Sequence, residues 1–190
     1  MNERFEKKHR LTGGKWLVLA LAGALVFAGC ARKQQSVAEK YQAAKALFES
    51  TSKQFHIPSA EAKGSEKLRL QQQALAGYRE IVRKYPEQDH WAAQSLRSIG
   101  NIYAAQTNVA AAVEQYSEVG RRYPSEGWEV LMAWKSAADL LWDANQRDQA
   151  DQFYAKVVER FDNPDAAQVI KMAVRGCKTR LQRPSEPSAG

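Results

Sequence analysis

The clearest pattern in the chain is a hydrophobic motif that recurs three times. Each copy places Ala, Tyr, an aliphatic residue and a second aromatic residue at positions i, i+4, i+7 and i+11. These positions share one face of an α-helix, and Arg, Lys and Glu occupy the other face. The fixed spacing of 38 residues predicts stacked structural units, and the copies are Ala74-Tyr78-Ile81-Tyr85, Ala112-Tyr116-Val119-Tyr123 and Ala150-Tyr154-Val157-Phe161.

A second helix is predicted ahead of the second and third copies, over about residues 90–105 and 126–145. Short turns at 107–108 and 145–147 would join each to the repeated helix, so that every unit is an antiparallel helix pair. Pro86 and Pro124 follow the first two copies, and a proline cannot continue the helical hydrogen-bond ladder. The pattern therefore predicts an all-α fold.

The same positions resemble the tetratricopeptide repeat, which implies a solenoid of antiparallel helix pairs. The period exceeds the family's usual length of about 34 residues, because extra residues lie at 87–89 and 125–127. Similar Tyr-Pro junctions with longer spacers occur in periplasmic tetratricopeptide proteins of the β-barrel assembly machinery and of the Tol-Pal system. The matching residues are Leu96, Ile99, Gly100, Tyr103, Ala112, Tyr116, Val119 and Pro124, then Trp134, Ala138, Ala150, Tyr154 and Val157.

We expect the repeat domain to span residues 36–182, with an extra helix capping each end. A helix is predicted over 36–55, followed by an interruption at Pro58 and Gly64 that makes the first unit atypical. A last helix over 164–182 would place Gly176 at the small-residue position held by Gly100 and Ala138, and would cover the preceding unit. Residues 183–190 are predicted to be a disordered, solvated tail.

The amino-terminal segment is typical of a secretory signal. Residues 1–15 are basic, and residues 16–29 form an uncharged run of 14 residues, shorter than the roughly 20 needed to span a membrane. The run ends in Phe27-Ala28-Gly29-Cys30, which resembles a bacterial lipobox, although Phe27 stands where Leu is usual. This resemblance implies a signal peptide over 1–29, acylation of Cys30 and a linker over 30–35. An uncleaved signal anchor is the alternative interpretation.

Charge and candidate chemistry argue against catalysis. The net charge of +7 is spread without a Lys/Arg cluster, so we expect no nucleic-acid binding. His56 and His90 lack a second ligand or acidic cluster at useful spacing, and we expect surface or capping roles for both, with no metal, cofactor or catalytic site. Cys177 is predicted to be a small buried thiol, and with Cys30 lipidated no disulfide is expected.

Function is therefore expected to reside in a surface that binds an envelope protein or peptide. The tetratricopeptide resemblance implies a concave face lined by Gln94, Arg97, Asn101, Met132, Lys135, Asp139 and Trp142.

Two hypotheses follow from this face and the amino-terminal signal. The first is an outer-membrane lipoprotein facing the periplasm that scaffolds an envelope complex; the lipid on Cys30 would be the membrane contact, and Ala31 favours outer-membrane sorting. The second is an accessory protein that binds peptidoglycan or exopolysaccharide through Trp91, Trp128 and Trp142. We also expect Trp91 and Trp128 to occupy equivalent places in successive repeats, soon after the Tyr-Pro junction. There they would either pack the spacer onto the preceding helix or anchor an interface.

Overall fold

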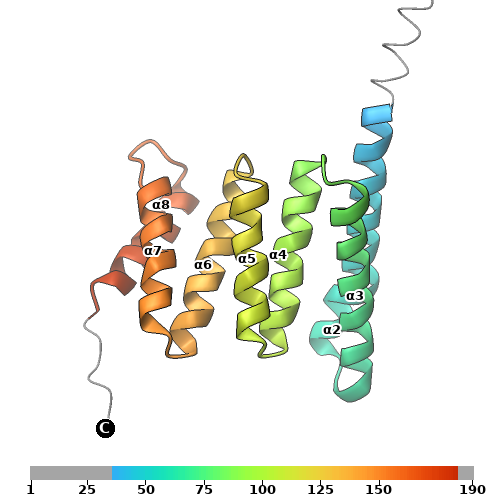
Figure 1. The fold of residues 1–190 in the computed structure, drawn as a ribbon, viewed down its shortest axis with the longest axis horizontal. Helices are drawn as coiled ribbons and strands as arrows, with labels where there is room; N and C mark the ends of the chain where they lie inside the picture. The colour runs from blue at the N-terminus through green and yellow to red at the C-terminus, as the bar shows by residue number, and fades with distance from the viewer. Residues whose placement is uncertain (1–35, 184–190) are drawn as a thin grey trace, which may run out of the picture. The chain divides into compact units, whose positions relative to one another are not determined.

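The computed structural model describes residues 36–183, which are helical with no strand, as the all-α prediction requires. The chain divides into two compact units, residues 1–41 and 42–190; in the first, the described residues 36–41 are helical. In the second, helical residues 42–51 lead into the π-helix η1 (Ser52–His56). The following helices are α2 (Ile57–Glu61), α3 (Gly64–Lys84), α4 (Asp89–Ala105), α5 (Val109–Arg122), α6 (Gly127–Asp143), α7 (Arg147–Phe161) and α8 (Gln168–Leu181) (Figure 1).

The proposed signal, Cys30, the linker and nearly all of the predicted tail lie outside the described residues. Within the range 36–183, none of the helices combines the length and the hydropathy needed to cross a membrane.

Consecutive helices from α3 to α8 pack side by side, and α4 also contacts α6 (Figure 1). The helices α4 and α6 lie where the sequence predicts the first helix of a pair, and α5 and α7 contain the repeated motif. Since only three residues separate α4 from α5 and α6 from α7, each of these pairs must be antiparallel. The helical hairpins predicted from the spacing are therefore present.

Both tight turns have the same backbone conformation. Thr107 and Asn145 each adopt a φ of 59°, a left-handed conformation that reverses the chain just after a helix. The next amide then donates back into the helix, from Asn108 to the carbonyl of Tyr103 and from Gln146 to that of Leu141. This pattern satisfies carbonyl groups that a helix end would otherwise leave unpaired. The two turns therefore have equivalent conformations, and Thr107 and Asn145 are again 38 residues apart.

One predicted boundary is wrong. Pro58 does not interrupt the first helical region, because the backbone is helical without a break from residue 42 to residue 61. The preceding turn is the π-helix η1, which absorbs the change in the hydrogen-bond ladder. The real break comes at Ala62 and Lys63, and Gly64 begins α3 with a φ of +55°.

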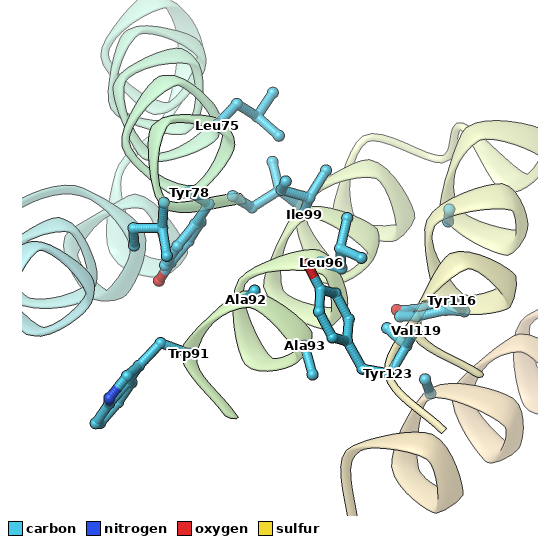
Figure 2. Close-up of a cluster of buried hydrophobic side chains, with 14 of the residues drawn as sticks. Leu75, Tyr78, Trp91, Ala92, Ala93, Leu96, Ile99, Tyr116, Val119 and Tyr123 are labelled. Atoms are coloured by element: carbon cyan, nitrogen blue, oxygen red, sulfur yellow. The ribbon is translucent and has the colours of Figure 1, made fainter. Parts of the chain in front are cut away.

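The core is built from the repeated motif. Tyr78, Tyr116 and Tyr154 are at most 2% exposed, and the aliphatic residue that follows each of them is completely buried. Figure 2 shows the part of this core around α3, α4 and α5. Gly100 is needed at its position, because a Cβ there would lie 2.5 Å from Cε1 of Tyr116. The tyrosine ring therefore fills the space that the missing side chain leaves on α4.

The spacers that lengthen the repeat are tied to one another by polar contacts. The hydroxyl of Ser125 donates to Asp89 at 3.3 Å, and Nδ1 of His90 lies 3.3 Å from a carboxylate oxygen of Glu126. Arg160 donates to the carbonyl of Pro124. Each contact spans 36 residues, so residues near one helix junction bind residues near the next.

Trp91 and Trp128 are not equivalent, contrary to the prediction. The residue 38 positions after Trp91 is Glu129, and the two indoles differ in environment as well. Trp91 is 9% exposed, and its ring lies 5.5 Å from that of Phe48. Trp128 is 43% exposed. Trp91 is thus a core residue of the first units, while Trp128 presents its indole to solvent.

Candidate partner-binding surface

The residues predicted for the concave face lie on two helices, α4 and α6, at matching positions. Gln94, Arg97 and Asn101 occur on α4, and the residues 38 positions later on α6 are Met132, Lys135 and Asp139. Trp142 lies one turn further along α6. Gln94 and Met132 are partly buried, and Oε1 of Gln94 is buried with no hydrogen-bond partner.

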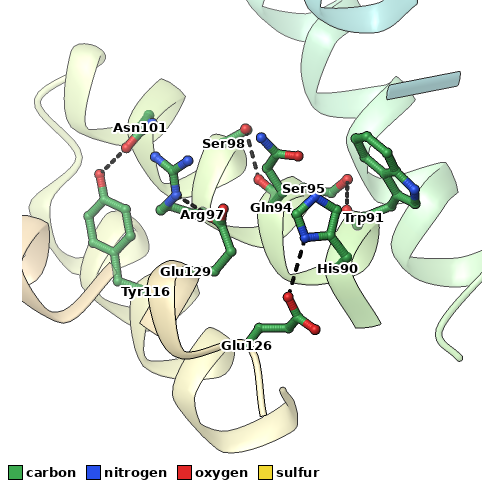
Figure 3. A network of polar contacts seen from close by, with 10 residues as sticks. All are labelled: His90, Trp91, Gln94, Ser95, Arg97, Ser98, Asn101, Tyr116, Glu126 and Glu129. Atoms are coloured by element: carbon green, nitrogen blue, oxygen red, sulfur yellow. Dashed lines mark hydrogen bonds and ion pairs between the residues drawn. The ribbon is translucent and has the colours of Figure 1, made fainter. Parts of the chain in front are cut away.

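Tyrosine hydroxyls organise the centre of this surface in a repeated way. Tyr116 donates to Oδ1 of Asn101 at 2.8 Å, and Tyr154 donates to Oδ1 of Asp139 at 2.8 Å (Figure 3 shows the first pair). Burial raises the pKa of Tyr116 to about 12. The pKa of Tyr154 is raised by burial and then by its hydrogen bond to the Asp139 carboxylate. Both hydroxyls therefore stay protonated and hold Asn101 and Asp139 in fixed positions.

Arg97 is placed by an ion pair with a residue that the sequence analysis missed. Its Nε donates to Oε2 of Glu129 at 2.5 Å; the Glu129 side chain is 4% exposed and that of Arg97 is 21% exposed (Figure 3). A carboxylate so deeply buried requires a cation, because an unpaired buried charge is strongly unfavourable. Arg97 thus connects α4 to α6 at the edge of the predicted face.

The second half of the face contains a hollow of about 390 Å³ between α6, α7 and α8. Lys135 donates to Oδ2 of Asp139 at 2.5 Å, so that this carboxylate is bound from two sides and its charge is balanced. The hollow presents charges of both signs together with a phenol. Its lining residues are Lys135, Asp139, Asp143, Tyr154, Gly176 and Arg180.

Two guanidinium groups lie close to the ring of Trp142. The Arg147 group lies 3.7 Å from the centroid of the indole and the Arg180 group 4.9 Å from it. Cation–π contacts of this kind orient an aromatic side chain and cover its faces. Trp142 consequently supports Arg180, which lines the hollow. Its ring has less surface open to a partner than the sequence suggested.

Sequence reasoning missed Glu129, Arg147 and Arg180, because the sequence gives little indication of their contacts. Glu129 is a charged residue at the position equivalent to the core residue Trp91, which marks it as a buried charge in need of a partner. Arg147 and Arg180 lie in different helices from Trp142, and no spacing rule brings them to one ring. The tyrosine contacts could have been found, because Tyr116 and Tyr154 each follow their acceptor by 15 residues.

His56 makes a partly buried polar contact with Tyr78, whereas the sequence predicted a surface or capping role. Its Nδ1 lies 3.0 Å from the hydroxyl of Tyr78. Burial, followed by the charge of Arg97, lowers the pKa of His56 below its ordinary value of 6.5.

This shift predicts a loss of stability at mildly acidic pH. Because the unfolded chain binds the His56 proton at a higher pH than the folded chain, the contribution is complete above pH 6.5 and is lost as the pH falls through the folded pKa. Urea denaturation at about pH 7.5 and about pH 5.5 measures the effect. The variant His56→Gln should show a smaller difference between the two pH values, and an unchanged difference would refute this assignment.

Burial makes the Cys177 thiol a poor candidate for a reactive group. Cys177 is buried and free, and burial raises the pKa of its thiol to about 11, which disfavours the reactive thiolate. Within residues 36–183, no group of three or more His, Cys, Asp or Glu side chains could hold a metal ion.

The fold and this surface define an all-helical chain of packed helical hairpins with a charged hollow near its last helix. No family model, curated protein or solved structure matches the chain significantly. The argument for a function consequently rests on the residues and their geometry.

Proposed function

We propose that the chain is a lipoprotein anchored through Cys30 in the outer membrane and facing the periplasm, whose tetratricopeptide-like domain scaffolds a protein complex of the cell envelope. The membrane part of the proposal rests on the lipobox-like end at Cys30 and on the short apolar run before it. The scaffold part rests on the helical hairpins and on their polar surface.

The assignment to a tetratricopeptide-like solenoid is supported by repeated local geometry. The hairpins α4–α5 and α6–α7 share their turn conformation, their buried tyrosine and the hydrogen bond from that tyrosine to the first helix. Stacked helix pairs of this kind expose the first helices on one side and form extended binding surfaces. The 38-residue period then reflects the spacers, which bind one another through Asp89 and Ser125 and through His90 and Glu126.

The hollow on the last hairpin carries the binding proposal. It is concave, it combines the cations of Lys135 and Arg180 with the carboxylates of Asp139 and Asp143, and its walls are fixed by buried contacts. Peptide segments present carbonyl, amide and charged groups together, and a site with both signs of charge fits such a mixture. We infer that a segment of the partner protein binds in this hollow.

Crosslinking in the native envelope, followed by affinity purification and mass spectrometry, tests this function. The double variant Lys135→Gln/Arg180→Gln should reduce recovery of the partner by about tenfold or more, since it removes both cations of the hollow. Lys156→Gln is the matched control, because Lys156 is exposed on α7 and does not line the hollow. Cys30→Ala should release the complex from the membrane fraction.

Recovery of the same abundant proteins from all variants would contradict the scaffold function. Binding of the purified chain to peptidoglycan sacculi would then favour the polymer-binding alternative. The structure gives that alternative less support than the sequence did, because Trp91 is buried and Trp142 is covered by two guanidinium groups. Trp128 is left as the exposed indole of the three.

A further inference from the structure

The last helix, α8, exposes a row of residues, here called the seam, whose counterparts on the earlier helices are buried or partly buried. Counting back in steps of 38 residues, α8 corresponds to α6 and α4. The counterparts of the first two seam positions are Ala93 and Leu96 on α4, which are 0% and 4% exposed, and Leu131 and Trp134 on α6, of which Leu131 is 0% exposed and Trp134 is partly buried. The corresponding residues of α8, Val169 and Met172, are 53% and 63% exposed. The full seam of α8 consists of Val169, Met172, Gly176 and Thr179, all of which are exposed.

The third seam position has a specific shape. On α4 it is Gly100, against which the ring of Tyr116 packs so closely that a Cβ would lie 2.5 Å from it. On α8 it is Gly176, and a Cβ built there would meet nothing within 4 Å. The slot that takes an aromatic ring in the earlier hairpin is therefore open on α8, at the outer edge of the hollow described above.

Basic residues line one side of this seam. From Gln168 to Leu181, α8 contains basic residues and no acidic one. Lys171 and Arg175 occupy positions where α6 has the buried alanines Ala133 and Ala137. They border a hollow of about 350 Å³ at the α7–α8 junction, where Asp162 is paired with Lys178 at 2.5 Å. The edge of the seam remains basic after that pairing.

We propose that the α8 seam binds an amphipathic helix of a partner protein, which places an aromatic side chain against Gly176 and acidic side chains along Lys171 and Arg175. The bound helix would complete a third hairpin, as α5 completes the one begun by α4. This contact goes beyond the scaffold function, because it uses the exposed seam of the last helix, which meets the hollow only at Gly176. Residues 184–190 contain no aromatic residue that could fill the slot.

A synthetic peptide with the α5 sequence is a suitable probe, because α5 is the helix that fills the same slot on α4. We would use residues 108–123 with Arg121 and Arg122 replaced by Glu, labelled with fluorescein, and titrate the full-length chain in detergent. Saturable fluorescence anisotropy is the expected result. The matched peptide with Tyr116→Ala should bind about thirtyfold more weakly, as expected for loss of an aromatic anchor.

Variants of the chain locate the site. Gly176→Leu closes the slot, Met172→Asp makes the seam polar, and Lys171→Gln/Arg175→Gln removes the basic edge; each should weaken binding of the peptide by about tenfold or more. Lys156→Gln is the control, because Lys156 is exposed on α7 and belongs neither to the seam nor to the lining of the hollow. Its affinity for the peptide should equal that of the wild type. Met172→Asp and Lys171→Gln/Arg175→Gln leave the lining of the hollow unchanged, so that they test the seam separately from the partner-binding hollow.

Four outcomes would overturn the proposal. Absence of saturable peptide binding would do so, as would binding that Gly176→Leu and Met172→Asp leave unchanged. Self-association that Gly176→Leu abolishes in sedimentation velocity would assign the seam to a second copy of the chain. Binding to phosphatidylethanolamine–phosphatidylglycerol vesicles that Met172→Asp and Lys171→Gln/Arg175→Gln reduce, without peptide binding, would assign it to the membrane surface.

Discussion

Replacing Arg97 with Met is expected to lower the free energy of unfolding by about 3 kcal/mol. The substitution leaves the Glu129 carboxylate, which is 4% exposed, in the core without a cation. Its burial is unfavourable unless a charge and hydrogen bonds compensate. Urea denaturation followed by circular dichroism measures the change, with the same slope for both proteins if only stability differs.

Two controls separate the buried charge from the lost side chain. The double variant Arg97→Met/Glu129→Leu should recover most of the loss, because no charge is then left in the core. Lys45→Met breaks an ion pair with Glu49 whose side chains are 42% and 61% exposed, and it should change stability by less than about 0.5 kcal/mol. A single variant Arg97→Met as stable as Lys45→Met would show that the Glu129 pair contributes little.

This ion pair affects how binding experiments on the predicted partner-binding face must be designed. The sequence suggested Arg97 as a partner-binding residue, and its guanidinium is partly accessible. Because Arg97 also compensates Glu129, a variant at this position would lose binding through instability even if it never touched a partner. Lys135 and Arg180 are better probes, since each is at least partly exposed and neither pairs with a deeply buried charge.

The repeated helices could be predicted from the sequence because hydrophobic periodicity and packing report the same property. Ala112, Tyr116 and Val119 recur on one face, and all three are buried in the structure. The tight turns could be located too, since Asn108 and Asn145 interrupt the pattern and Asn is favoured in turns. Asn108 in fact accepts a hydrogen bond from the amide of Ala111 as a helix N-cap.

The first helical region could not be predicted correctly, because the effect of Pro58 depends on the hydrogen-bond ladder of the preceding turn. Proline breaks a regular helix interior but is tolerated after a π-helical turn, where the ladder has already changed. The choice between these depends on the π-helix η1, for which the residues Ser52–His56 give no clear pattern. The failed equivalence of Trp91 and Trp128 has a similar origin, since a shift of one residue turns a helical side chain by about 100°.

The binding surface was predictable only in outline. The positions of Asn101 and Asp139 follow from the period, but their orientation depends on the tyrosine hydroxyls of the next helix. The setting of Trp142 depends on Arg147 and Arg180 from two further helices. Such contacts join residues whose separation is set by tertiary packing, and a periodic pattern contains no information on which long side chains meet.

The same substitution at two equivalent glycines is expected to have opposite effects on stability. Gly100→Leu should lower the free energy of unfolding by about 3 kcal/mol or more, because the new side chain must displace the buried ring of Tyr116. It would also strain the hydrogen bond from Tyr116 to Asn101. Gly176→Leu should raise stability by up to about 1 kcal/mol, because Leu is the better helix former and the site is open.

Thermal and urea denaturation of both variants provide the measurement, and Gly100→Ala gives an intermediate test. Ala138 is the equivalent residue on α6 and is completely buried in the same core cluster as Tyr154, so an alanine is compatible with this position. Gly100→Ala should therefore be less damaging than Gly100→Leu. Equal destabilisation by Gly100→Leu and Gly176→Leu would mean that the α8 slot is occupied within the chain itself, and the end face would then be unable to accept a partner helix.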